Sequence, residues 1–123
     1  SLPSLIKANR IQEKVRAVGF DWEERSQVWD KVEEELEELK VEVERQNRNR
    51  IEGEFGDLLF SVVNAARLYN IDPETALERT NRKFMKRFGY LESKTIKQGQ
   101  SLKDMTLDQM NAIWEESKQF DTE

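Results

Sequence analysis

Two short groups of acidic residues have the spacing of a carboxylate metal site. Glu35 and Glu38 lie three positions apart, with Glu34 beside them, and Glu54 and Asp57 repeat that spacing after fifteen intervening residues. Helical positions three apart point to nearly the same side, so each pair presents two carboxylates together. Four clustered carboxylates repel one another unless cations or protons neutralise them. The pattern therefore predicts a site for hard divalent cations and, because Mg²⁺ bridges to phosphates, a phosphate ester or anhydride as substrate.

The composition excludes most other metal sites and catalytic groups. The 123 residues include no Cys and no His, which removes zinc fingers, iron-sulfur clusters, thiol nucleophiles and imidazole bases. A di-iron carboxylate bundle needs Glu-x-x-His pairs and is excluded for the same reason. The net charge of -5 carries no long block of one sign, which predicts no nucleic-acid partner. The absence of a long apolar run predicts no membrane partner and a cytoplasmic location.

The acidic pairs lie on the two segments with the clearest helical periodicity. The first segment runs from about Glu23 to Asn47, the second from Ile51 to Tyr69, and the polar run 45–50 between them predicts a turn. The two helices should pack antiparallel through their apolar stripes, with the acidic pairs at the edges of those stripes. The first stripe is Val28, Val32, Leu36, Leu39 and Val43, and the second is Ile51, Phe55, Leu58, Leu59, Val62, Ala66 and Tyr69. The remaining acids of the first helix, Glu33, Glu37, Glu42 and Glu44, are interpreted as a solvated face.

Three further helices complete an all-α antiparallel bundle of about five helices in a single domain, residues 1–123. One helix follows Pro3 and ends at Gly19, before a loop at 19–22. Another is capped by Asp72 and runs to about Gln98. The last begins after a capping box that starts at Thr106. The low content of five Gly and two Pro, with 37% charged residues, suits long solvated helices.

The ordered motifs resemble one enzyme family over nearly the whole chain. Lys31-Val-Glu-Glu-Glu-Leu-Glu-Glu-Leu39, followed by Glu54-Phe-Gly-Asp-Leu-Leu-Phe60, resembles the EExxE, variable spacer, ExxD signature of the MazG nucleotide pyrophosphohydrolases. Segments 18–22, 28–32 and 81–88 and the late Trp114 are similar to the C-terminal catalytic domain of MazG. The resemblance implies an all-α enzyme that uses Mg²⁺, with Mn²⁺ as a substitute, to convert nucleoside triphosphates to monophosphates and pyrophosphate. It also implies a homodimer, and a domain found either alone or in tandem within a longer chain.

The resemblance assigns roles to individual residues. It marks four acids as the metal ligands and catalytic residues: Glu35, Glu38, Glu54 and Asp57. It implies a substrate-binding set made of Lys31, Glu34, Lys83, Arg87 and Trp114, with the two cations near positions 83–87 on the phosphates and the indole against the base. Glu34 lies about 100° around the helix from Glu35, which makes it a weaker candidate ligand and an ion-pair partner for Lys31 or Lys103.

Several features of the mechanism have more than one interpretation at this stage. The proton of the attacking water passes to a carboxylate or to a metal-bound hydroxide, and the attack is on the α- or the β-phosphorus. No set of polar residues predicts discrimination between bases, so broad base specificity and a role in cleansing the nucleotide pool are expected. The alternative function is a non-enzymatic helical interaction module. Mg²⁺ should raise the melting temperature of a metal enzyme beyond the effect of ionic strength, and should not do so for such a module.

Overall fold

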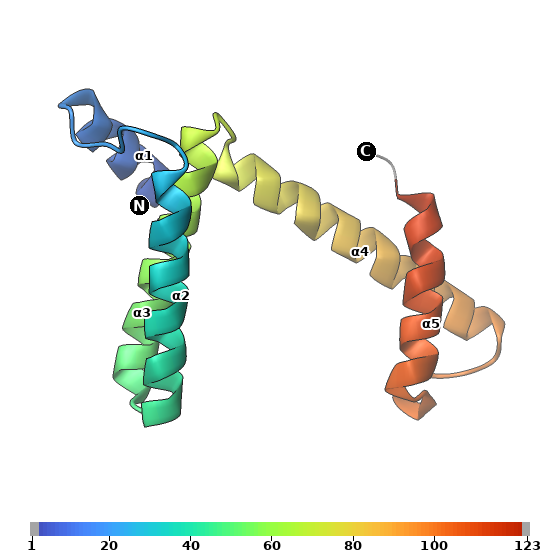
Figure 1. The fold of residues 1–123 in the computed structure, drawn as a ribbon. Coiled ribbons are helices and arrows are strands. Elements are labelled where there is room, and N and C mark those ends of the chain that lie inside the picture. The colour runs from blue at the N-terminus through green and yellow to red at the C-terminus, as the bar shows by residue number, and fades with distance from the viewer. Residues whose placement is uncertain (1–2, 122–123) are drawn as a thin grey trace. The chain divides into compact units, whose positions relative to one another are not determined.

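A computed structural model describes residues 3–121 as five α-helices and two short 3₁₀-helices, without a strand in that range (Figure 1). This confirms the all-α fold class. Within the described residues, none of the helices combines the length and apolar character needed to cross a membrane. The α-helices are α1 (Ser4–Ala17), α2 (Gln27–Arg45), α3 (Arg48–Leu68), α4 (Pro73–Lys97) and α5 (Leu107–Ser117), and the 3₁₀-helices are η1 (Leu102–Asp104) and η2 (Lys118–Phe120).

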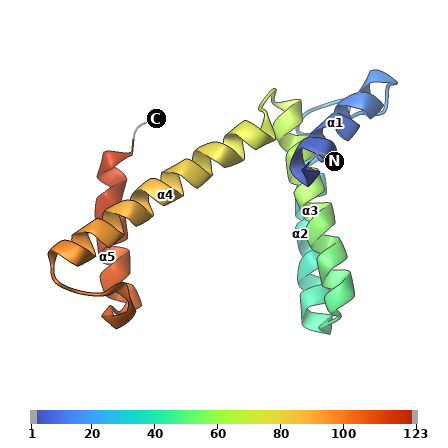
Figure 2. The ribbon, with the colours of Figure 1, turned by 180° about the vertical axis from the view of Figure 1, so that it is seen from behind.

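Helices α2 and α3 form an antiparallel hairpin joined by two residues, and they run side by side in both views (Figures 1 and 2). Gln46 ends α2 in the left-handed conformation, with φ of 59°. Asn47 then caps α3, because its side chain accepts a hydrogen bond of 3.2 Å from the backbone N–H of Arg50. The antiparallel arrangement was predicted, but the turn at 45–50 was predicted too long. An αL residue followed by an asparagine cap reverses the chain without further residues.

The core of this part of the chain differs from the predicted apolar stripes. Val28 and Leu39 of α2 are 0% and 6% exposed, as expected. On α3 the buried apolar residues are Val63 and Ala65, whereas the predicted stripe residue Leu59 is 62% exposed. The reason is that α3 contacts both α2 and α1. A helix that packs against two neighbours buries residues on two sides, whereas the prediction assumed one apolar stripe.

The chain divides into two compact units, residues up to Ala76 and residues from Leu77 onward. In the second unit, the buried apolar residues that the structure describes are Leu91 of α4 and Ile113 of α5. The predicted capping box at the start of α5 is confirmed, because Thr106 and Gln109 exchange backbone-to-side-chain hydrogen bonds of 2.9 and 3.1 Å. This division reflects which parts of the chain contact one another. That residues 1–123 form a single functional domain stays a prediction.

Candidate metal and substrate site

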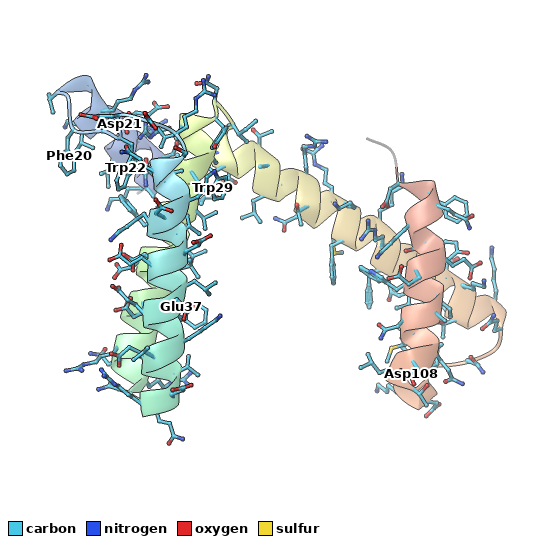
Figure 3. All side chains as sticks on the ribbon, viewed as in Figure 1. Phe20, Asp21, Trp22, Trp29, Glu37 and Asp108 are labelled. Atoms are coloured by element: carbon cyan, nitrogen blue, oxygen red, sulfur yellow. The ribbon has the colours of Figure 1, made fainter. Side chains whose placement is uncertain are left out.

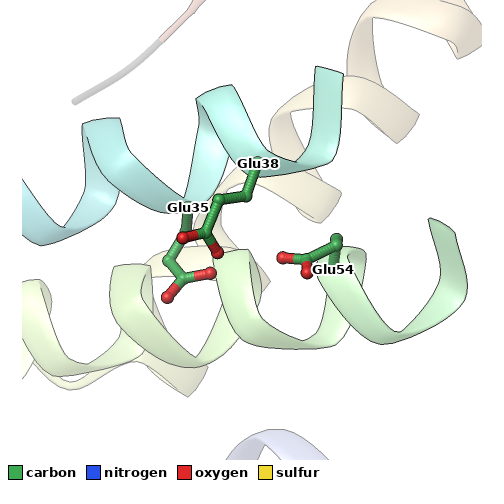
Figure 4. Close-up of side chains that lie close together, drawn as sticks. All are labelled: Glu35, Glu38 and Glu54. Carbon is green, nitrogen blue, oxygen red and sulfur yellow. The ribbon is translucent and has the colours of Figure 1, made fainter. Parts of the chain in front are cut away.

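Three of the four predicted metal ligands come together where α2 and α3 face each other. Glu35 and Glu38 extend from α2 and Glu54 extends from α3 (Figure 4). One carboxylate oxygen from each of the three lies within 4.8 Å of the others. The two-residue turn places these helices in the register that opposes the two motifs. We call Glu35, Glu38 and Glu54 the acidic cluster.

Two members of the acidic cluster carry buried oxygens that have no partner. The Oε2 atoms of Glu35 and Glu54 are buried and accept no hydrogen bond from any described residue. Glu35 as a whole is only 6% exposed, whereas Glu38 is exposed. A buried carboxylate oxygen without a donor is unfavourable, and a cation satisfies several such oxygens at once. The donor set is made of carboxylates, which matches the preference of Mg²⁺ or Mn²⁺ for oxygen ligands.

The charges of these acids perturb one another. The charge of Glu35 is the main cause that raises the pKa of Glu38, followed by burial and the charge of Glu54. Burial is the main cause that raises the pKa of Glu54, and the charges of Asp57 and Glu35 raise it further. Both shifts mean that the ionised cluster is disfavoured when no cation is bound. Asp57 lies outside the three-residue group, but its charge acts on Glu54, one helical turn away.

Glu42 was assigned to a solvated face, and this prediction was wrong. Its side chain is 12% exposed, its Oε2 is buried without a partner, and its charge raises the pKa of Glu54. Position 42 lies four residues after Glu38 and seven after Glu35, so it shares their side of α2. That spacing was present in the sequence and was the signal for a fifth acid near the cluster. The other three acids of the predicted solvated face are exposed: Glu33, Glu37 and Glu44.

Lys31 neutralises part of the cluster from one turn before it. Its Nζ lies 2.9 Å from Glu35 Oε1 and 3.3 Å from Glu34 Oε2. The bonds to these two glutamates raise the pKa of Lys31, with Glu35 the larger cause. The side chain of Glu34 is 56% exposed and that of Glu35 is 8% exposed. The helical geometry predicted that Glu34 points away from the cluster and Glu35 toward it, and these exposures agree with that prediction. Of the two predicted ion-pair partners for Glu34, the structure shows Lys31.

The other predicted substrate-binding residues belong to the second unit, where Arg87 already has a partner. Its guanidinium forms an ion pair with Asp121, and this bond raises the pKa of Arg87 and lowers that of the carboxyl. The charge of Lys83 also lowers the pKa of Asp121. The ring of Trp114 lies 4.9 Å from that of Phe84, centroid to centroid, which is a packing contact between α5 and α4. Their roles in substrate binding stay predictions.

The sequence of this chain is similar to curated proteins over most of its length. Residues 24–90 match the MazG nucleotide pyrophosphohydrolase domain. The chain is 44% identical to the "Nucleoside triphosphate pyrophosphohydrolase/pyrophosphatase MazG" of Thermotoga maritima, over 95% of the chain and 45% of that protein. It is 38% identical to the "Nucleoside triphosphate pyrophosphohydrolase" of Escherichia coli K12, over 96% of the chain and 46% of that protein. The chain thus spans about half the length of these curated relatives.

Proposed function

The chain belongs to the MazG nucleotide pyrophosphohydrolase family, and from this premise we propose that it hydrolyses nucleoside triphosphates to monophosphates and pyrophosphate. The observation that carries the proposal is the acidic cluster, which the family signature marks and which the hairpin assembles from two separate motifs. The names of the relatives from Thermotoga maritima and Escherichia coli support the same reaction.

The proposed cofactor is Mg²⁺, with Mn²⁺ as a substitute. Glu35, Glu38 and Glu54 would hold it, with Asp57 as the fourth ligand that the family signature implies. The buried, unpartnered oxygens of the cluster support this assignment. When bound, divalent cations supply positive charge that orients the triphosphate, acidifies the attacking water and stabilises the departing pyrophosphate.

The chain's own residues then hold the site in a reactive arrangement. Lys31 fixes the carboxylate of Glu35 through a 2.9 Å ion pair and brings a positive charge to the edge of the cluster. A carboxylate of the cluster is the only type of side chain there that accepts a proton near neutral pH, since the chain lacks His and Cys. Lys83 and Arg87 are proposed to bind phosphate oxygens, and Arg87 does so by exchanging the carboxylate of Asp121 for the substrate.

We propose a homodimer assembled through the α2–α3 hairpin. Trp29, Leu36 and Val43 recur every seven residues on α2 and are 48%, 37% and 49% exposed. Three residues with the same spacing on α3 are also 40% to 50% exposed: Phe55, Val62 and Tyr69. The indole N–H of Trp29 donates a 2.8 Å hydrogen bond to Tyr69 Oη, so the start of one stripe lies beside the end of the other. Two adjacent exposed stripes, each with a seven-residue repeat, suit a four-helix arrangement in which the hairpin packs against that of a second copy.

We further propose that the enzyme accepts nucleoside triphosphates with any of the common bases and removes unwanted nucleotides from the pool. We place this activity in the cytoplasm, where the nucleotide pool is. Phosphates and metal supply most of the binding in such a site, and they are shared by all nucleoside triphosphates.

Product identity tests the proposed reaction. Purified protein with Mg²⁺ should release pyrophosphate and monophosphate from the eight common ribo- and deoxyribonucleoside triphosphates. Glu35→Gln should abolish this release, whereas Glu37→Gln, which changes a 71% exposed side chain on the same helix, should leave it unchanged. Release of orthophosphate and nucleoside diphosphate, or no release from any of the eight substrates, would show that the proposed reaction is wrong.

A further inference from the structure

Every seventh residue of α2 from Val28 to Glu42 lies on the buried side of the helix. Val28 is 0% exposed, and the side chains of Glu35 and Glu42 are 8% and 12% exposed. Positions seven apart differ by only about 20° around a helix, so these three residues share one side. Glu37 lies between the two acids on α2 (Figure 3), but it points about 160° away from Glu35 and its side chain is 71% exposed. Glu42 therefore occupies a position where an apolar side chain would ordinarily pack.

Glu35 and Glu42 divide their carboxylate oxygens in the same way. Oε1 of Glu35 lies 2.9 Å from Nζ of Lys31, and Oε1 of Glu42 lies 3.3 Å from Nη1 of Arg45. In both acids Oε2 is buried, and it accepts no hydrogen bond from any residue that the structure describes. Each carboxylate is thus held at one oxygen by a cation of its own helix. The second oxygen needs a donor or a cation from outside the chain, because a buried charged acceptor without a partner is unfavourable.

Glu42 lies beside the acidic cluster but does not belong to it. It follows Glu38 by one helical turn, about 6 Å along the axis. Its charge is also one of the causes that raise the pKa of Glu54 on the facing helix. Among the described residues, the carboxylate oxygens that converge within 4.8 Å come from Glu35, Glu38 and Glu54, without Glu42. Glu42 is therefore placed next to the proposed ligands and not among them.

The chemistry of the proposed cofactor supplies a partner for this oxygen. Mg²⁺ keeps several water molecules when carboxylates bind it, and these waters donate hydrogen bonds. Groups that accept such bonds fix the arrangement around the cation and strengthen its binding. Glu42 has a buried acceptor oxygen beside the ligands, and Arg45 already holds its other oxygen. Without a cation, the same carboxylate only adds to the repulsion within the cluster.

We infer that Glu42 is a positioning residue of the metal site, whose Oε2 accepts a hydrogen bond from water on the bound cation while Arg45 orients the carboxylate. The inference rests on the proposed function for the presence of a cation at the acidic cluster. It adds to the residues of the family signature an acid that does not coordinate the cation itself. Removing this carboxylate should therefore weaken cation binding without destabilising the metal-free protein.

Binding of Mn²⁺ to the full chain tests this role without turnover, because electron paramagnetic resonance measures the free ion. Glu42→Gln should weaken Mn²⁺ affinity about tenfold and Glu42→Leu about a hundredfold, since glutamine keeps one acceptor oxygen and leucine keeps none. The number of bound ions should stay that of the wild type. Glu37→Gln is the matched control, because it removes the same charge from an exposed position of α2, and it should leave the affinity unchanged. Glu35→Gln removes a proposed ligand and should weaken binding further than Glu42→Leu does.

Thermal melting of the metal-free proteins separates this role from a structural one. Glu42→Gln and Glu42→Leu should melt at the wild-type temperature or above it, because each removes a buried charge that neighbouring acids repel. A structural ion pair between Glu42 and Arg45 predicts the opposite. Melting temperatures below that of the wild type in both variants would therefore overturn the inference, whatever their Mn²⁺ affinity.

The binding data distinguish a failure of this inference from a failure of the proposed function. Wild-type Mn²⁺ affinity in both Glu42 variants would overturn the inference, and so would the loss of one bound ion, which would make Glu42 a direct ligand. Neither result would affect the proposed reaction, which product identity tests. A wild type that binds no Mn²⁺ would overturn both the metal site and the role of Glu42. The expected affinities in a protein that releases no pyrophosphate would instead refute the reaction and retain that role.

Discussion

Replacing Arg67 by methionine should destabilise the first unit strongly, because Arg67 is the buried half of an ion pair that links α3 to Asp21, in the segment between α1 and α2. The side chains of Arg67 and Asp21 are 6% and 18% exposed, and their nearest atoms are 2.8 Å apart. Removing one partner of a fully buried pair costs about 3–5 kcal/mol, and an exposed pair contributes about 0.2–1 kcal/mol. Because Asp21 retains some contact with water and with Arg16, we expect a loss of about 2–3 kcal/mol.

Urea denaturation of the full chain, followed by far-UV circular dichroism, measures this loss. Arg16→Met is the matched control, since Arg16 contacts the same carboxylate at 3.3 Å from a side chain that is 64% exposed. Its substitution should cost about 0.5 kcal/mol. Equal losses in the two variants would refute the view that burial of Arg67 gives the ion pair its strength.

The pH dependence of the same variants gives a second test. The hydrogen bond from Arg67 lowers the pKa of Asp21 below its ordinary value of 3.8. A lowered pKa in the folded state means that the stabilisation is complete above the ordinary value and is lost as the pH falls through the lowered one. The stability difference between wild type and Arg67→Met should therefore be constant from pH 5 to 7 and shrink below about pH 4. A difference that grows on acidification would contradict this assignment.

Three further predictions concern the site and the assembly. Glu38→Gln and Asp57→Asn should each abolish pyrophosphate release. The metal-free variants should melt at the wild-type temperature or above it, because each substitution removes one of several repelling charges. Unimpaired release in both variants would contradict the proposed metal site. Light scattering across a broad concentration range should give the mass of a dimer. Val43 is 49% exposed in the apolar stripe of α2, so Val43→Lys places a charge there and should shift the measured mass toward that of the monomer. A monomeric wild type would contradict the hairpin interface. If the contact of Trp114 with Phe84 is structural, Trp114→Ala should lower the free energy of unfolding by about 3–5 kcal/mol, which a calorimetric melt measures. If the indole stacks on the base, the same substitution should raise KM for all nucleoside triphosphates by similar factors, which steady-state kinetics measures.

The sequence predicted the all-helical fold and the proximity of Glu35, Glu38 and Glu54 because both depend on local spacing. The starts of α2 and α3 differ from the predicted ones at Glu23 and Ile51 by three or four residues. The predicted caps at Asp72 and Thr106 fix helix starts through side chains within three residues. The cap at Asn47 was not predicted, although it acts over the same short distance in the chain. The three-residue spacing within each acidic motif is likewise a property of one helix, and the short turn brings the two motifs together. Features that follow from one helix and one turn can be predicted from residue order alone.

Features that depend on a third element were not predictable in the same way. The buried side of α3 differs from its predicted stripe because α1 packs on it, and periodicity does not reveal which helices will be neighbours. The cavity beside the acidic cluster is lined by Arg67 and Asp21, which form an ion pair although they are 46 residues apart in the chain. Glu42 is an intermediate case, since its spacing from Glu38 was visible but its burial depends on how α3 packs against α2.

The two-residue turn couples the length of the chain between the motifs to the geometry of the site. Only Gln46 and Asn47 separate α2 from α3, so a residue inserted between Glu38 and Glu54 either lengthens this turn or is absorbed into a helix. In the second case the insertion changes the register of the acids. One extra residue rotates the acids of that helix by about 100° and moves them by about 1.5 Å along its axis. Opposition of the two motifs returns only when both helices gain about one full turn, a total of about seven residues. Insertions or deletions within the two helices can therefore move the acidic cluster along the hairpin, away from the turn or toward it, only in discrete steps.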